Sequence, residues 1–133
     1  MPRTVLADTG PLYAAVDPDD RHHARAHREL LELGRQKTTV ALAYPTLLEA
    51  YTLILYRLGR PSASRWLHEI VAGTSLINPT SDDYRAAVAK VDVYVDQSIT
   101  LFDATSAVMA VRLGIPVWTY DYHFDVMGIP VWR

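Results

Sequence analysis

The sequence predicts an α/β fold in which a mostly parallel central sheet is flanked by helices on both faces, an α/β/α sandwich. Short β-branched or apolar runs alternate along the chain with longer segments of helical periodicity. Strands that are separated by helices pair in parallel. The chain has 133 residues, of which 50% are hydrophobic, and this is enough to bury the core of one domain. We therefore expect a single domain over residues 1–133.

Two strands and one helix are expected in the first third of the chain. The runs "TVLA" at 4–7 and "TTVALA" at 38–43 are apolar or β-branched, as strands are. Between them, "DPDD" forms a turn and Asp20 caps an amphipathic helix that continues to about Leu33. Gly34 is expected to end this helix.

Helices dominate the middle of the predicted fold. Pro45 opens a helix that ends at "RLG", and the next helix, "PSASRWLHEIVAG", covers residues 61–73. The run "SLINP" at 75–79 is expected to be a short strand. A helix then begins at Thr80 and continues to about Val95.

One helix and two strands complete the predicted fold. Thr100 begins the helix and Gly114 ends it. The last residues contain "PVWTY" and "IPVW", which are expected to form two strands around a short connection.

Composition and charge exclude several classes of protein. The chain has no cysteine, so neither a disulfide framework nor a thiolate metal site is available. It carries 13 basic and 15 acidic side chains, so any contact with nucleic acid needs a local patch rather than a global positive charge. The apolar stretch at the N-terminus is shorter than the roughly 7–15 residues of a signal-peptide core. We therefore expect a cytoplasmic protein.

The most apolar window, 40–58, approaches the length of a membrane span, about 20 residues. Pro45, Glu49 and Arg57 interrupt it. We expect a buried strand and helix here, and no membrane partner.

Four acidic residues have no charged neighbour nearby in the sequence. Asp8 is the only charged residue from 4 to 16, and Glu49, Asp103 and Asp121 are isolated in the same way. An isolated carboxylate in an apolar element is costly to bury unless a cation satisfies it. These four carboxylates are therefore the first candidates for a functional site.

Their positions are expected to bring these carboxylates together. Asp8 and Asp121 lie at the carboxyl ends of two predicted strands, and Glu49 and Asp103 lie within the first turns of predicted helices. In a doubly wound sheet, these strand ends and helix N-termini face one crevice, where ligands bind. Clustered carboxylates without a basic neighbour suit Mg²⁺ or Mn²⁺, because these ions prefer oxygen ligands and keep water molecules for chemistry.

Each carboxylate also has a structural alternative. Asp8 is placed to form a turn with its own backbone, and Asp121 to punctuate a loop. Asp103 fits a capping box with Thr100. For Glu49 the alternative requires a buried partner from another part of the chain.

Four stretches of the sequence together resemble one known family. They are "VLADTGPLYAAVDPDDRHHARA", "LLEAYTLILYRLG", "SITLFDATSAVMA" and "VWTYDYHFD". This ordered set of D-T, E, D-A and T-x-D-x-H-F resembles the PIN domain. The length and order resemble the VapC-type toxins of bacterial toxin–antitoxin pairs. The similarity covers essentially the whole chain.

The resemblance implies a fold, a site and an activity. It implies a single PIN-like domain whose acidic site consists of Asp8, Glu49, Asp103 and Asp121, as metal ligands and catalytic residues. It further implies an endoribonuclease that uses one or two Mg²⁺ or Mn²⁺ ions to hydrolyse phosphodiester bonds in RNA. The implied partners are a cognate antitoxin, which holds the enzyme inactive, and a second copy of the chain in a homodimer.

Three further residues are candidates for an outer role at this site. The hydroxyls of Thr9 and Thr119 each stand beside a candidate ligand, where they could orient carboxylates or water molecules. Asp125 could supply an additional carboxylate. The alternatives are that the threonines only pack in strands and that Asp125 is a solvated loop residue.

Other functions use similar residues. A phosphoaspartyl receiver needs a lysine near the last strands, but the only lysines are Lys37 and Lys90. A phosphatase with an aspartate nucleophile needs an Asp-x-Asp motif, and Asp8 is followed by Thr9 and Gly10. A PIN-like module that binds protein or RNA without catalysis is the remaining alternative, although the intact set of four carboxylates argues against it.

Two more groups have defined expectations. His23 and His27 are four residues apart on a predicted helix, but the HExxH glutamate of a zinc site is missing, so we expect packing or an interface. Arg57, Arg60 and Arg65 flank a helix end and are expected to contact RNA phosphates.

Charged residues with charged neighbours are expected on solvated faces. Examples are the neighbours Asp82 and Asp83, and the arginines Arg21, Arg25 and Arg28 on one helix.

Overall fold

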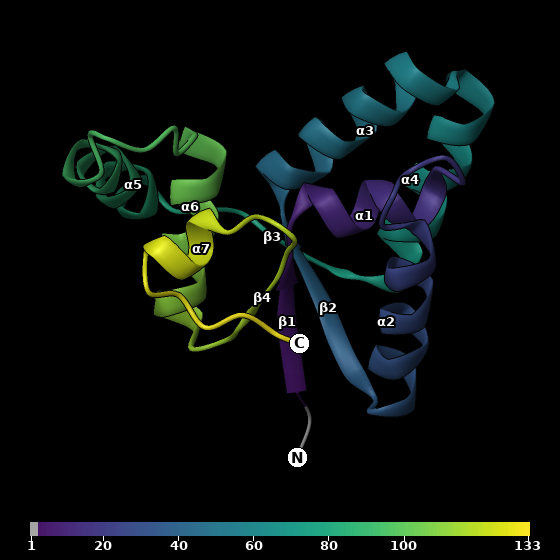
Figure 1. Ribbon diagram of the computed structural model, residues 1–133, viewed down its shortest axis with the longest axis horizontal. Helices are drawn as coiled ribbons and strands as arrows, with labels where there is room; N and C mark the ends of the chain where they lie inside the picture. The colour runs from purple at the N-terminus through teal and green to yellow at the C-terminus, as the bar shows by residue number, and fades with distance from the viewer. Residues whose placement is uncertain (1–2) are drawn as a thin grey trace.

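A four-stranded parallel sheet forms the centre of the protein (Figure 1). The computed structural model describes residues 3–133. The order of the strands is β3-β2-β1-β4. The strands are β1 (Arg3–Ala7), β2 (Thr38–Ala43), β3 (Ser75–Ile77) and β4 (Val117–Trp118). The parallel sheet that the sequence predicts is confirmed.

Helices cover both faces of this sheet, as Figure 1 shows with α1 to α4 on one side and α5 to α7 on the other. The first group comprises α1 (Thr9–Val16), α2 (His23–Arg35), α3 (Tyr44–Leu58) and α4 (Arg60–Gly73). The second group comprises α5 (Ser81–Val93), α6 (Leu101–Leu113) and α7 (His123–Val126).

The strands divide their side chains between two hydrophobic cores. Val5 and Ala7 of β1 pack with α1 to α4, whereas Leu6 packs with α5 to α7. In β4, Trp118 joins the first core and Val117 the second. This division follows from the strand geometry, because successive side chains point to opposite faces. The α/β/α sandwich is therefore confirmed.

The apolar window at 40–58 forms part of β2 and then α3, as expected. Pro45 lies in the first turn of α3, where its missing N–H costs no helical hydrogen bond. Within residues 3–133, no helix has the length and apolar character that crossing a bilayer requires.

Two short helices were not predicted. α1 begins directly after Asp8, and its apolar sequence lacks the polar face that would mark a helix. Pro11 is accommodated because it lies in the first turn, where N–H groups have no helical partner. α7 is a single turn, too short to show periodicity. The strand expected at 129–132 is reduced to one bridge between Val117 and Val131.

The bounds of α2 also differ from the prediction. The Asp20 carboxylate accepts a hydrogen bond from the backbone N–H of His22 in a turn before the helix, which begins at His23. Gly34 lies inside the helix. The chain turns instead at Lys37, which has a positive φ of 54°. Gly114 ends α6 in the left-handed conformation, as predicted. The helix α5 ends at Val93, close to the predicted Val95.

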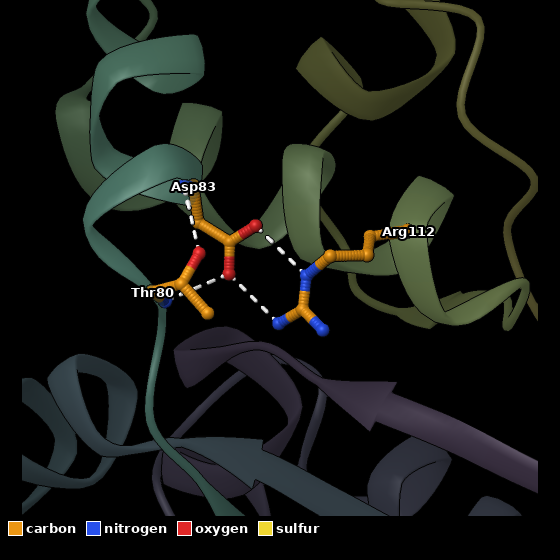
Figure 2. A network of polar contacts seen from close by, with 3 residues as sticks. All are labelled: Thr80, Asp83 and Arg112. Atoms are coloured by element: carbon orange, nitrogen blue, oxygen red, sulfur yellow. Dashed lines mark hydrogen bonds and ion pairs between the residues drawn. The ribbon is translucent and has the colours of Figure 1, made fainter.

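An ion pair between a buried aspartate and a partly exposed arginine joins α5 to α6 (Figure 2). The hydroxyl of Thr80 accepts a hydrogen bond from the N–H of Asp83, whose carboxylate accepts one from the N–H of Thr80, so the capping box is complete. Arg112 donates from Nε and Nη2 to the two carboxylate oxygens of Asp83 at 2.9 and 2.7 Å. Asp83 is only 2% exposed, so the expectation of a solvated face is wrong for this residue.

We expect Asp83→Ala to lower the free energy of unfolding by about 2–4 kcal/mol, because it removes a buried charge partner and a helix cap together. Its neighbour Asp82 is the matched control, since its side chain is 92% exposed and pairs with Arg85 at the surface. Asp82→Ala should leave stability nearly unchanged. Urea unfolding of both variants in EDTA measures the difference, and equal losses would contradict the assignment.

Candidate metal centre

The candidate site lies at the carboxyl end of the sheet, between β1 and β4. β2 and β3 continue on one side of β1, whereas β4 lies on its other side, so the direction of winding changes at this point. Ligands of open α/β sheets bind at such a switch point. Ala7 pairs with Trp118, so Asp8 and Thr119 follow these two strands side by side.

Asp8 does not use its carboxylate to cap α1. Its Oδ2 accepts a hydrogen bond of 2.8 Å from the Thr119 hydroxyl, and its N–H donates to the carbonyl oxygen of Trp118. Burial, together with the charges of Asp121 and Glu49, raises the pKa of Asp8 to about 6. The alternative of a simple backbone turn therefore does not describe this residue.

Asp103 lies at the first turn of α6 and is 8% exposed. The Thr100 hydroxyl accepts a hydrogen bond from the N–H of Asp103, so half of the predicted capping box is present. Among the described hydrogen bonds, none returns from the N–H of Thr100 to this carboxylate. Burial, followed by the charges of Asp8 and Asp121, raises the pKa of Asp103 to about 7. The carboxylate thus faces other carboxylates.

Asp121 lies in the segment between β4 and α7. Its N–H donates to the Thr119 hydroxyl, and its Oδ1 accepts a hydrogen bond of 2.9 Å from the N–H of His123. Asp121 therefore has the turn contact that its structural alternative predicts, but this hydrogen bond uses only Oδ1 of the carboxylate. Asp103, Asp121 and His123 each offer one ligand atom, and these atoms all lie within 4.8 Å of one another.

Glu49 lies in the second turn of α3, not in the first turn as predicted, because the helix begins at Tyr44. It accepts a hydrogen bond from the Thr9 hydroxyl. Its partner is thus a hydroxyl rather than a buried cation. Thr9 and Thr119 each contact a candidate carboxylate, as their expected outer role requires. Asp125 is exposed on α7 and pairs with Arg133, and its described contacts include none of the four carboxylates.

Oxygen donors without a cationic partner make this cluster fit a hard divalent ion. Within residues 3–133, none of the ion pairs involves Asp8, Glu49 or Asp103. The raised pKa values of Asp8 and Asp103 show that the carboxylates repel one another and are poorly solvated. Mg²⁺ or Mn²⁺ would relieve both penalties, because either ion is bound by carboxylates and retains water.

The other expected groups have structural roles or no described ligand. His23 Nδ1 lies 2.7 Å from the carbonyl oxygen of Ala14, and His27 Nε2 lies 3.1 Å from that of Ala15. Both contacts join the start of α2 to the end of α1, so the predicted packing role fits His23, which is half-buried, whereas His27 is exposed. The Arg57 guanidinium lies 5.2 Å from the centre of the Tyr13 ring, and its predicted contact with RNA stays a prediction.

Two residues near the site were missed by the sequence reasoning. His123 stands two positions after Asp121, a spacing that could have identified it as a potential nitrogen ligand. Glu29 accepts hydrogen bonds from Trp118 and Tyr120. The need of a buried indole N–H and a phenol for polar partners was the available signal, but it did not identify which carboxylate would serve.

Solved structures share this fold over nearly their whole length. VapC20 of Mycobacterium tuberculosis, a sarcin–ricin loop cleaving toxin, is 23% identical with a TM-score of 0.85, covering 97% of this chain and 98% of that one. VapBC2 of Rickettsia felis, bound to a promoter DNA fragment, is 14% identical with a TM-score of 0.75, covering 98% and 97%. A toxin–antitoxin complex from Klebsiella pneumoniae is 20% identical with a TM-score of 0.65, covering 97% and 96%.

Because these three structures are less than 25% identical to this chain, their likeness establishes the fold alone. No curated protein matches the sequence. The model of the PIN domain family matches residues 5–130, which include all four candidate carboxylates. The chain therefore belongs to the PIN domain family.

Proposed function

We propose that the protein is an endoribonuclease that depends on Mg²⁺ or Mn²⁺ and acts as the toxin of a toxin–antitoxin pair. One observation carries this proposal: Asp8, Glu49, Asp103 and Asp121 lie close enough to influence one another. Within residues 3–133, only Asp121 of these four has a described ion-pair partner, which is His123. Membership of the PIN family and the likeness to VapC20 support it. The proposed catalytic domain covers residues 1–133.

The four carboxylates would hold one or two ions. A bound ion supplies an activated water and neutralises the negative charge that develops on the phosphate. The Thr119 hydroxyl fixes one oxygen of Asp8, and the Thr9 hydroxyl fixes one oxygen of Glu49, so both carboxylates keep a defined direction. Because burial and the charges of Asp8 and Asp121 raise the pKa of Asp103 to about 7, this carboxyl group would hold a proton part of the time at neutral pH without a cation and would be ionised as a metal ligand.

The proposed partners are an antitoxin and a second copy of the chain. Apolar side chains are exposed beside Glu49, with Leu48 at 65%, Tyr56 at 83% and Phe102 at 43%. Exposed apolar patches of this kind favour protein partners. The toxin–antitoxin complex among the similar structures supports an antitoxin as one of them. A cytoplasmic location accompanies this proposal, because the proposed substrate is RNA inside the cell.

The purified protein should cleave RNA in Mg²⁺ or Mn²⁺ and lose this activity in EDTA. Cleavage should return when the divalent ion is restored, because the carboxylates themselves remain intact. Gel analysis of a labelled RNA measures the reaction. Undiminished cleavage in EDTA would contradict a metal-dependent mechanism.

Expression without an antitoxin should arrest growth, whereas the Asp103→Ala variant should be harmless. Growth curves and sequencing of RNA ends after brief expression measure the effect. Arrest that persists in this variant, without new RNA ends, would favour the alternative of a PIN-like module that acts only by binding protein or RNA.

A further inference from the structure

The segment that follows β4 divides its side chains between α2 and the candidate site. Trp118 and Tyr120 both donate hydrogen bonds to one carboxylate oxygen of Glu29 on α2, the Trp118 Nε1 bond being 3.1 Å long. Thr119, between them, donates to Asp8 and accepts from the N–H of Asp121. Alternate residues of this segment are thus held by two different parts of the protein.

Strand pairing with β1 ends before residues 119–121. The ladder between β1 and β4 ends at the pair Ala7 and Trp118. The last backbone hydrogen bond on this side runs from the N–H of Asp8 to the carbonyl oxygen of Trp118. Beyond it, the carbonyl oxygen of Asp121 accepts one long backbone hydrogen bond of 3.4 Å from the N–H of Phe124, and the other described hydrogen bonds of residues 119–121 involve side chains.

Tyr120 packs against the first turns of α2 and against His22, which precedes the helix. The Arg25 guanidinium lies 4.2 Å from the centre of the Tyr120 ring, and the ring of His22 lies 4.8 Å from it. Arg25 Nε also lies 3.4 Å from the second carboxylate oxygen of Glu29, whose side chain is only 16% exposed. Both oxygens of Glu29 are therefore engaged. Arg21 and Arg28 are exposed, as predicted, and the Arg25 side chain keeps 40% of its surface exposed while it contacts Tyr120.

We propose that Glu29 is a positioning residue for the candidate metal centre. β4 ends at Trp118 and the chain bends at Tyr120, so holding these two side chains against α2 fixes Thr119 between them. The Thr119 hydroxyl then contacts both Asp8 and the N–H of Asp121. Glu29 acts through these neighbours and touches none of the four carboxylates in the described contacts. This inference rests on the proposed function.

The expected consequence of removing Glu29 is weaker metal binding. Without it, the Tyr120 hydroxyl and the Trp118 N–H lose their shared acceptor, and the segment carrying Thr119 and Asp121 gains freedom. Losing the partners that orient metal ligands typically costs 10–100-fold in metal affinity or activity. We expect the apparent KM for RNA to stay within about twofold, because the described contacts of Glu29 are with Arg25, Trp118 and Tyr120 and with none of the four carboxylates.

The test compares Glu29→Ala with Glu32→Ala in the full chain. Glu32 is a matched control on the same helix, where it pairs with Arg35 at the surface. Calorimetric titration of the metal-free protein with Mn²⁺ gives the affinity, and RNA cleavage gives kcat and KM separately. We expect Glu29→Ala to weaken Mn²⁺ binding and lower kcat by at least about 10-fold, and Glu32→Ala to leave both unchanged.

A second variant keeps the inference testable if Glu29→Ala does not fold. Tyr120→Phe removes one hydroxyl and keeps the ring that Arg25 covers. It should weaken Mn²⁺ binding in the same direction, and adding it to a folded Glu29→Ala variant should have little further effect, since both act through one contact. Glu29→Gln keeps an acceptor oxygen and should recover part of the affinity.

The outcomes separate the two proposals. A wild-type protein that binds Mn²⁺ and cleaves RNA, with a Tyr120→Phe or a folded Glu29→Ala variant that matches it in Mn²⁺ affinity and kcat, would overturn the positioning role alone. A wild-type protein that neither binds Mn²⁺ nor cleaves RNA would overturn the proposed function and, with it, the positioning role.

Discussion

Replacing Asp8 by Asn should lower the proposed RNA cleavage at least about 100-fold while the protein stays folded. Asp8 is the carboxylate that lies directly at the switch point of the sheet, fixed by the Thr119 hydroxyl. An amide keeps the shape of this side chain and an oxygen for that hydroxyl, but it removes the charge that binds a cation. The loss should therefore appear in catalysis and in divalent-ion affinity.

Stability measurements separate this loss from unfolding. Burial raises the pKa of Asp8 to about 6, so the charged form is disfavoured in the folded protein. At neutral pH in EDTA, Asp8→Asn should therefore be neutral or stabilising. The matched control is Asp82→Asn, an exposed carboxylate that should retain full activity. Full cleavage by folded Asp8→Asn would remove Asp8 from the site.

The stability of the metal-free protein should fall as the pH rises from about 4 to about 7. The pKa values of Asp8 and Asp103 are raised from 3.8 to about 6 and about 7, so the folded protein binds more protons than the unfolded chain in this range. The stability that these two groups contribute is fully present when the pH is below their pKa in the unfolded chain. It is lost as the pH rises through their pKa values in the folded protein. We expect a decrease of about 2–4 kcal/mol, measured by urea unfolding in EDTA.

Divalent ions should reverse this decrease. At about 100 times its dissociation constant, Mg²⁺ adds roughly 2.7 kcal/mol if the unfolded chain does not bind it. Asp103→Asn removes one of the repelling charges, so it should be neutral or stabilising in EDTA, with a smaller Mg²⁺ shift and less cleavage. Thermal melts with EDTA and with Mg²⁺ measure both effects.

If Asp103 is only a helix cap, Asp103→Asn should have the opposite effects on stability and on the Mg²⁺ shift. This alternative predicts a loss of about 1 kcal/mol or less that is independent of Mg²⁺, with activity intact. Asp83 provides the matched control, because it occupies the same position in the complete capping box of Thr80. Asp83→Asn should lower the melting temperature in EDTA and keep the full Mg²⁺ shift. The same pattern in Asp103→Asn would identify Asp103 as a helix cap.

The two T-x-x-D segments show where sequence reasoning reaches its limit. Thr80 and Thr100 both begin helices, as their local sequence predicts, because capping depends on residues that are close in the chain. The two aspartates then differ through distant partners. Asp83 is paired with Arg112, which lies 29 positions away, whereas Asp103 faces Asp8 and Asp121. Because these partners are distant in the chain, the residues around each motif do not predict which contact its aspartate makes.

The difference between local sequence signals and contacts with distant residues also explains which other site residues could be predicted. The isolated carboxylates could be found from the sequence because an uncompensated charge in an apolar element is a local property. Glu29 could not, because charged residues surround it on α2 and its partners Trp118 and Tyr120 lie 89 and 91 positions away. The strand and helix order follows from local periodicity, but α7 is too short for periodicity to reveal it.

Diffraction from crystals soaked in Mn²⁺, recorded where manganese scatters anomalously, tests the central claim most directly. The account predicts one or two anomalous peaks at the carboxyl end of the sheet, about 2.1 Å from carboxylate oxygens of Asp8 and at least one of Glu49, Asp103 and Asp121. The peaks should be absent from Asp8→Asn crystals under the same conditions. Wild-type crystals with no peak among these four residues at saturating Mn²⁺ would contradict the account.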